Sequence, residues 1–176
     1  FTQRSTKPRA VKMRGLLFLS ALVLAFGLSG CASKFQSYNG PEVTRVYVDK
    51  GDRRMYLLHH EQVLKSYDVG LGFAPVGHKR IEGDGRTPEG EYLIDRRNPN
   101  SAFYLSIGIS YPNEADRAYA RSIGKSPGGD IFIHGRPFKN RKGGRDWTAG
   151  CIAVTNREMR EIYAMVQNGT PISIYP

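Results

Sequence analysis

Two stretches of the 176-residue sequence matter most for its interpretation: DIFIHG at residues 130–135 and TAGCIAV at residues 148–154. Each contains an apolar run typical of a short strand. The first ends in His134-Gly135, and the second carries Cys151, seventeen residues after His134. A cysteine attacks as its thiolate, and histidine is its usual base. The spacing alone leaves a second interpretation open, in which His134 and Cys151 are ordinary core residues.

Glycines flank both of these residues. Gly150 allows a sharp turn before Cys151, and backbone N–H groups around Gly150 and Cys151 are candidates for binding an oxyanion. Gly135 permits close approach, and a nearby backbone carbonyl is a candidate for holding the imidazole tautomer. A loop rich in glycine and basic residues, 136–145, joins the two stretches.

Short β-strands separated by turns are predicted outward from these stretches. The helix beginning at Thr155 has a capping box with Glu158 and an apolar stripe at helical spacing. A second, shorter helix is predicted at 114–121. The predicted strands are 43–48, 54–59, 63–70, 91–94, 104–109, 130–134, 151–154 and 171–176.

The composition narrows the class of protein. Hydrophobic residues make up 40% and aromatic residues 11%, enough for a core, so the chain is not wholly disordered, collagen-like or a coiled coil. Half of the net charge of +10 lies in residues 1–31, which hold five basic residues and no acid. The rest suits an anionic partner, and no nucleic-acid motif accompanies it. The adjacent His59 and His60 face opposite sides of a strand, so no metal site is expected.

The first thirty residues resemble an export signal. An apolar run of thirteen residues, 16–28, follows Met13-Arg14-Gly15; it is too short to span a membrane and has the basic flank of a signal peptide. Leu28-Ser29-Gly30-Cys31 resembles a bacterial lipobox. We therefore expect a lipoprotein signal peptide at 1–30, with Met13 as the natural initiator, lipidation of Cys31 and a tether at 31–42.

The alternative is a plain signal peptide with an incidental cysteine. Ala32 after the lipidated residue favours the outer membrane, with the protein on the periplasmic side of the envelope. With Cys31 lipidated, Cys151 has no intramolecular partner, so it is either a buried inert thiol or a nucleophile.

Taken together, His134-Gly135 and 148–152 resemble the signature of the L,D-transpeptidase (YkuD-type) catalytic domain. Residues 83–92 resemble its Thr-Pro-x-Gly segment, and 110–113 and 128–134 resemble further parts of it. The resemblance covers 43–176 and implies a single, mainly β, β-sandwich-like catalytic domain with one or two short helices.

The resemblance also implies a chemistry. Cys151 would attack a diaminopimelate carbonyl of a peptidoglycan stem peptide and form a thioester, with His134 as general base and acid and the Gly135 carbonyl orienting its ring. An amine from another stem or from a lipoprotein would resolve the thioester. Water as acceptor would make the protein an L,D-carboxypeptidase, and an amidase releasing lipoprotein from peptidoglycan is the other hydrolytic alternative. No metal or cofactor is implied.

Two positions depart from the family pattern. Ala153 stands where arginine is common, and Ala149 where histidine is common, so a non-catalytic peptidoglycan-binding lipoprotein is an alternative. The substrate contacts we expect are Arg136, Arg145, Trp147 and Thr148, with Lys139, Arg141 and Lys142 adding to a basic rim. Trp147 either lines the groove or packs beneath the loop.

Overall fold

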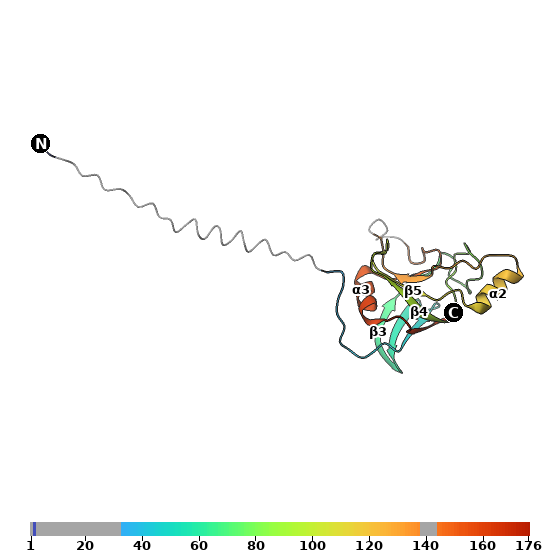
Figure 1. The fold of residues 1–176 in the computed structure, drawn as a ribbon, viewed down its shortest axis with the longest axis horizontal. Coiled ribbons are helices and arrows are strands. Elements are labelled where there is room, and N and C mark those ends of the chain that lie inside the picture. The colour runs from blue at the N-terminus through green and yellow to red at the C-terminus, as the bar shows by residue number, and fades with distance from the viewer. Residues whose placement is uncertain (1, 3–32, 138–143) are drawn as a thin grey trace. The chain divides into compact units, whose positions relative to one another are not determined.

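Eight strands and two helices make up the part of the chain that the computed structural model describes, namely residue 2 and residues 33–137 and 144–176 (Figure 1). The compact unit within it runs from Lys34 to Pro176. In chain order the elements are β1 (Arg45–Asp49), β2 (Arg54–His59), β3 (Gln62–Asp68), β4 (Gly90–Asn98), β5 (Ser106–Ile109), α2 (Glu114–Ser122), β6 (Phe132–His134), β7 (Ile152–Ala153), α3 (Asn156–Met165) and β8 (Pro171–Tyr175).

The strands form one sheet in the order β3-β2-β1-β8-β4-β5-β6-β7. Its two halves meet in β4, whose first residues pair with β8 and whose later residues pair with β5. A register irregularity between Ile94 and Arg96 lies where β4 passes from one half to the other, as is typical of a strand that bends. The prediction of a mainly β domain with one or two short helices is confirmed, and the described residues contain two.

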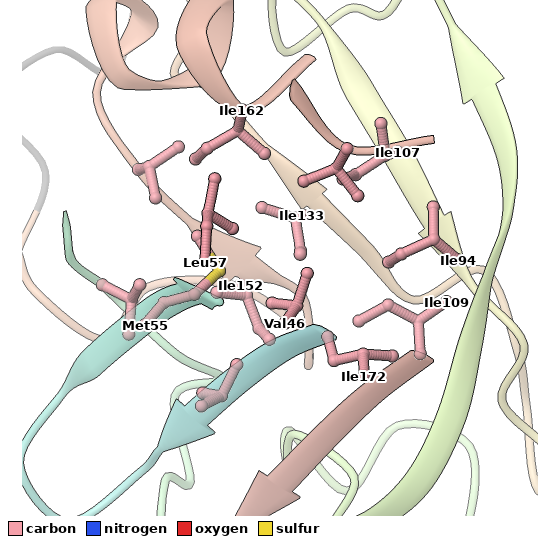
Figure 2. Packing of buried hydrophobic residues seen from close by; sticks show 14 of the residues in the cluster. Val46, Met55, Leu57, Ile94, Ile107, Ile109, Ile133, Ile152, Ile162 and Ile172 are labelled. Carbon is pink, nitrogen blue, oxygen red and sulfur yellow. The ribbon is translucent and has the colours of Figure 1, made fainter. Parts of the chain in front are cut away.

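The core lies between the two halves of the sheet. Figure 2 shows Val46, Met55 and Ile172 of one half facing Ile109 and Ile133 of the other. Each of these side chains is fully buried. Burial of this kind stabilises by roughly 25 cal/mol per Å² of apolar surface, so the core fixes β6 and β7 at a defined place in the sheet.

Helix α3 begins where the sequence predicts. The Thr155 side chain accepts from Glu158 N, and the Glu158 carboxylate accepts from Thr155 N at 2.8 Å. Met159 and Ile162 of its apolar stripe are fully buried. Since the N-cap Thr155 comes only two residues after Ala153, the last residue of β7, the cap anchors the end of β7.

Several strand boundaries differ from those predicted. β3 ends at Asp68 instead of residue 70, β7 holds only two residues, and β4 continues to Asn98. Apart from residue 2, the expected signal peptide at 1–30 and the lipidation site Cys31 lie outside the described residues. In the expected tether, Tyr38 packs against the core. Of the helices that are described, none is both long and apolar enough to cross a membrane.

Candidate active site

Cys151 and His134 line the same cavity, which has a volume of about 440 Å³. The parallel pairing of β6 with β7 places His134 beside Ala153. Cys151 comes two residues before Ala153, and successive side chains of a strand alternate between faces. The sheet therefore directs the thiol and the imidazole to one side. The cavity is also lined by Asn98, Ser101, Ala102, Phe103, Ser106, Asp130 and Phe132.

The backbone next to His134 fixes its tautomer. Nδ1 lies 2.6 Å from the carbonyl oxygen of Gly135, and His134 is only 3% exposed. A carbonyl can only accept, so Nδ1 carries the proton and Nε2 is left as an acceptor. The pKa of His134 is lowered, mainly because the ring is buried. The hydrogen bond to the Gly135 carbonyl raises this pKa, and the nearby Arg136 cation lowers it. The resting ring is neutral at neutral pH.

Gly135 is held in place by close packing that admits no side chain. A Cβ there would lie 2.4 Å from Oδ1 of Asn156 and 2.9 Å from the Phe103 carbonyl oxygen. The same Asn156 oxygen accepts from Arg136 N at 2.7 Å. Asn156, the first residue of α3, therefore positions the carbonyl that orients His134. This role of Asn156 is not predictable from the sequence, because an asparagine at a helix start is ordinary.

Aromatic rings surround the imidazole. The Phe103 ring centroid lies 4.5 Å from that of His134, and Trp147 contacts His134 edge-on at 5.7 Å. The guanidinium of Arg136 lies over the Trp147 ring at 5.4 Å. Trp147 thus packs against the base, which was the packing alternative considered for it, and it does not line the cavity among the described residues.

The thiol of Cys151 is half-buried. Its sulfur accepts from Phe132 N at 3.4 Å and donates to the Asp130 carbonyl at 3.5 Å. Burial is the main reason that the pKa of Cys151 is raised, and the Asp130 carboxylate adds to this effect. The Phe132 N–H and the cations of Lys79 and Arg96 act in the opposite direction and lower the pKa. The net direction is upward, so the thiol is protonated at rest and needs a base to become a nucleophile.

A hydrogen-bonded turn presents Cys151. The Thr148 hydroxyl accepts from Gly150 N at 3.1 Å and donates to the Cys151 carbonyl at 2.7 Å. Gly150 has φ +138°, and a Cβ there would lie 2.6 Å from the Arg86 carbonyl oxygen. Two expectations are corrected here. Thr148 is buried within the turn rather than exposed to substrate, and the Gly150 N–H is already bonded to Thr148 rather than aimed at an oxyanion.

A glycine-rich segment that was not among the predicted site residues, 70–73, supports this turn. Gly70 exchanges two backbone hydrogen bonds with Ala153, each 2.8 Å, and Phe73 N donates to the Thr148 carbonyl. Cβ atoms at Gly70 and Gly72 would each come within 2.0 Å of a carbonyl oxygen. Backbone thus packs directly on backbone, and a Gly70-x-Gly72 pair after a predicted strand was the available signal.

An ion pair fixes the start of the same loop. The Asp146 carboxylate accepts from Arg53 Nη2 at 3.0 Å and from Leu71 N at 2.9 Å. Asp146 immediately precedes Trp147, so this ion pair connects the β1–β2 turn to residues 146–151, the nucleophile loop that leads to Cys151.

The predicted basic residues lie elsewhere. Arg136 and Arg145 line a separate cavity of about 230 Å³, and Arg145 is mostly exposed. Lys139, Arg141 and Lys142 fall outside the described residues. Across residues 33–137 and 144–176, no group of three or more His, Cys, Asp or Glu side chains is arranged to hold a metal.

Replacing Thr148 by valine is expected to loosen the turn. The shape is kept, but the buried Gly150 N–H and the Cys151 carbonyl lose their partner, at a cost of about 1–3 kcal/mol. Urea unfolding measures this loss, and peptide mapping after iodoacetamide treatment measures faster alkylation of Cys151. Thr148→Ser keeps the hydroxyl and restores both values; equal behaviour of the two variants would contradict the positioning role.

The chain is similar to known proteins. The family model described as the YkuD L,D-transpeptidase catalytic domain matches residues 43–174. The candidate L,D-transpeptidase YafK of Escherichia coli strain K12 is 29% identical over 154 residues, which cover 81% of this chain and 57% of YafK. The candidate L,D-transpeptidase YkuD of Bacillus licheniformis is 30% identical over 132 residues, covering 75% of this chain and 66% of that protein.

A solved structure is similar as well. The helical cell shape determining protein Pgp2 of Campylobacter jejuni superposes with a TM-score of 0.60 at 27% identity, covering 82% of this chain and 51% of Pgp2. The chain therefore spans little more than half the length of YafK and Pgp2.

Proposed function

The chain belongs to the family of YkuD-type L,D-transpeptidase catalytic domains, and on that premise we propose that it is a cysteine acyltransferase acting on peptidoglycan stem peptides. The observation that carries the proposal is the shared cavity of about 440 Å³, lined by Cys151 and by a buried His134 whose Nε2 is an acceptor. The names of the relatives YafK and YkuD, both designated for L,D-transpeptidase activity, support it.

In the first half of the reaction, Nε2 of His134 takes the thiol proton and Sγ of Cys151 attacks the diaminopimelate carbonyl. The carbon–nitrogen bond to the terminal residue breaks, and the imidazolium returns the proton to the leaving amine. The product is a thioester on Cys151. The Phe132 N–H, 3.4 Å from the sulfur, stabilises the thiolate as it forms. Since the Gly150 N–H is engaged, we assign the oxyanion to the N–H of Cys151 itself.

In the second half, an acceptor attacks the thioester. His134 takes the proton of the acceptor and gives it to the departing sulfur, which regenerates the thiol. An amine of another stem yields a cross-link, and an amine of a lipoprotein yields an attached protein. Water yields the carboxypeptidase reaction. We favour transfer because the relatives YafK and YkuD are named L,D-transpeptidases.

The expected location is part of the same proposal. The substrate lies outside the cytoplasmic membrane, which agrees with the export signal expected at 1–30 and lipidation at Cys31. We propose a lipid-anchored protein on the periplasmic side of the envelope, at the outer membrane. Metabolic labelling with a fatty-acid probe tests this: label is expected on the full chain and should be absent from Cys31→Ala.

Mass spectrometry tests the reaction. Incubation with a disaccharide-tetrapeptide is expected to yield an acyl-enzyme whose added mass is that of the donor minus that of the released terminal amino acid. Muropeptide analysis then separates the acceptors, because transfer gives dimers and hydrolysis gives tripeptides. Sacculi carrying an attached lipoprotein test for amidase activity. Absence of both adduct and product would contradict the proposal.

A carbapenem distinguishes the enzyme from a non-catalytic binding protein. An activated thiol opens the β-lactam ring and keeps the fragment, whereas an inert thiol does not. Intact-mass measurement is expected to show one adduct that peptide mapping places on Cys151. Binding to sacculi without such an adduct would favour the non-catalytic alternative.

A further inference from the structure

A second cavity reaches Cys151. It has a volume of about 340 Å³ and shares only Cys151 and Asp130 with the first cavity. Its walls include Lys79, Glu82 and Ala149, together with glycines at 83, 128 and 129. The residues without large side chains keep the space open, and Ala149 contributes to this at a position where histidine would narrow it. The nucleophile therefore faces two separate spaces, and His134 lines only the first.

Lys79 is a buried cation in the wall of this second cavity. It is 3% exposed, and its Nζ donates to the Ile81 carbonyl at 3.0 Å and to Asp84 Oδ1 at 2.9 Å. An ammonium has three donor hydrogens, so these two contacts leave one for a ligand. Lysine is rarely buried without a reason.

Asp84 does not serve Lys79 alone. Its carboxylate also accepts three backbone N–H groups, from Arg80 at 2.8 Å and from Ile81 and Arg86 at 3.1 Å. These donors satisfy Asp84 without the ammonium, so its role in folding the loop 79–86 does not depend on Lys79. The loop therefore places Lys79 in the cavity wall as an ammonium paired with Asp84, and the third N–H of that ammonium is left for a ligand carboxylate.

Negative charges lie at the exposed side of the same cavity. Glu82 is exposed, and the Asp130 side chain is 94% exposed, with Arg96 Nη2 3.7 Å from its Oδ1. The cavity thus combines one buried ammonium with two accessible carboxylates. A single cation or anion would match only part of this pattern, whereas an α-amino acid group, with its carboxylate and ammonium on one carbon, matches all of it.

We propose that the second cavity binds the zwitterionic amino acid end of the donor's side chain, with Lys79 donating to its carboxylate and Glu82 and Asp130 accepting from its ammonium. This inference rests on the proposed function and names a binding site for it. His134 has to protonate the leaving amine, so the leaving residue belongs in the first cavity. The acyl part is then left for the second, and the diaminopimelate side chain ends in such an amino acid group.

The test uses two tetrapeptide donors that differ only at the third residue. Lysine in place of diaminopimelate keeps the side-chain ammonium and removes the carboxylate. The wild type is expected to prefer diaminopimelate in kcat/KM by about 10- to 100-fold, the range of one charge-assisted hydrogen bond. Lys79→Met is expected to lose that factor on the diaminopimelate peptide, mainly through KM, while its rate on the lysine peptide stays unchanged.

Controls separate the possible failures. Lys65→Met removes an exposed lysine that is paired with Glu161 on another surface and is expected to leave both rates unchanged. Lys79→Arg keeps the cation and is expected to retain part of the preference. Glu82→Gln is expected to lower kcat/KM for both donors, since both keep the side-chain ammonium that Glu82 is proposed to bind.

Each remaining outcome has a defined meaning. Equal rates of the wild type on the two donors would overturn the inference and leave the proposed function standing. An equal loss on both donors in Lys79→Met would show a purely structural role and would also overturn it. Failure of the wild type to turn over either donor would overturn the proposed function.

Discussion

Replacing Cys151 by alanine is expected to abolish acyl-enzyme formation and lower turnover of a stem tetrapeptide by more than about 10³-fold. The sulfur is the only atom of this side chain that can carry the acyl group. Its two contacts, at 3.4 and 3.5 Å, are long, so the fold is expected to keep its thermal unfolding midpoint. Intact-mass spectrometry and thermal unfolding of the same sample measure both effects.

Cys151→Ser is the matched control for this substitution. The hydroxyl has nearly the shape of the thiol, but it ionises far less readily and is a weaker nucleophile. We expect the serine variant to bind the tetrapeptide as well as the wild type does and to turn it over as slowly as the alanine variant. An alanine variant that still releases the terminal residue would end the thioester mechanism.

Replacing His134 by glutamine is expected to lower kcat by about 10²- to 10⁴-fold, the usual contribution of a general base. Burial raises the pKa of Cys151 and lowers that of His134, so at neutral pH the pair is a neutral thiol and a neutral imidazole. The thiolate therefore has to be made by proton transfer during the reaction.

The pH profile of kcat/KM tests whether neutral His134 is the base. In the wild type, activity is expected to rise with pH through the His134 pKa, with a midpoint below the ordinary imidazole value of about 6.5, and then to level off. In His134→Gln this acid limb should disappear, and activity should rise only in alkaline solution as Cys151 ionises by itself. A glutamine variant that retains the acid limb would assign that limb to another group.

The sequence was most informative where a residue's role depends on its neighbours along the chain. The capping box of Thr155, the strand 54–59 and the placement of His134 at the end of its strand all follow from local patterns, and the structure agrees with each. The continuation of β4 to Asn98 was missed because residues 95–98 are polar. Their pairing with β5, which is distant in sequence, makes them a strand.

Less of the candidate site could be predicted from the sequence, because several of its residues act through contacts with residues distant in the chain. Asn156 and Asp146 act on His134 and on the nucleophile loop through contacts made only in the folded chain. Thr148 was expected to bind substrate, but its hydroxyl is engaged by the backbone of its own turn. Lys79 is buried in the wall of a cavity that also reaches Cys151, and no local sequence pattern indicates this burial.

The contact of 70–73 with the nucleophile turn through bare backbone has a consequence for protein engineering. Because Gly70, Gly72 and Gly150 leave no volume for a side chain, libraries that randomise this flank of the pocket will return mostly misfolded proteins. Diversity aimed at new acceptors belongs at Ser101 and Ala102, which line the cavity of Cys151 and are not buried.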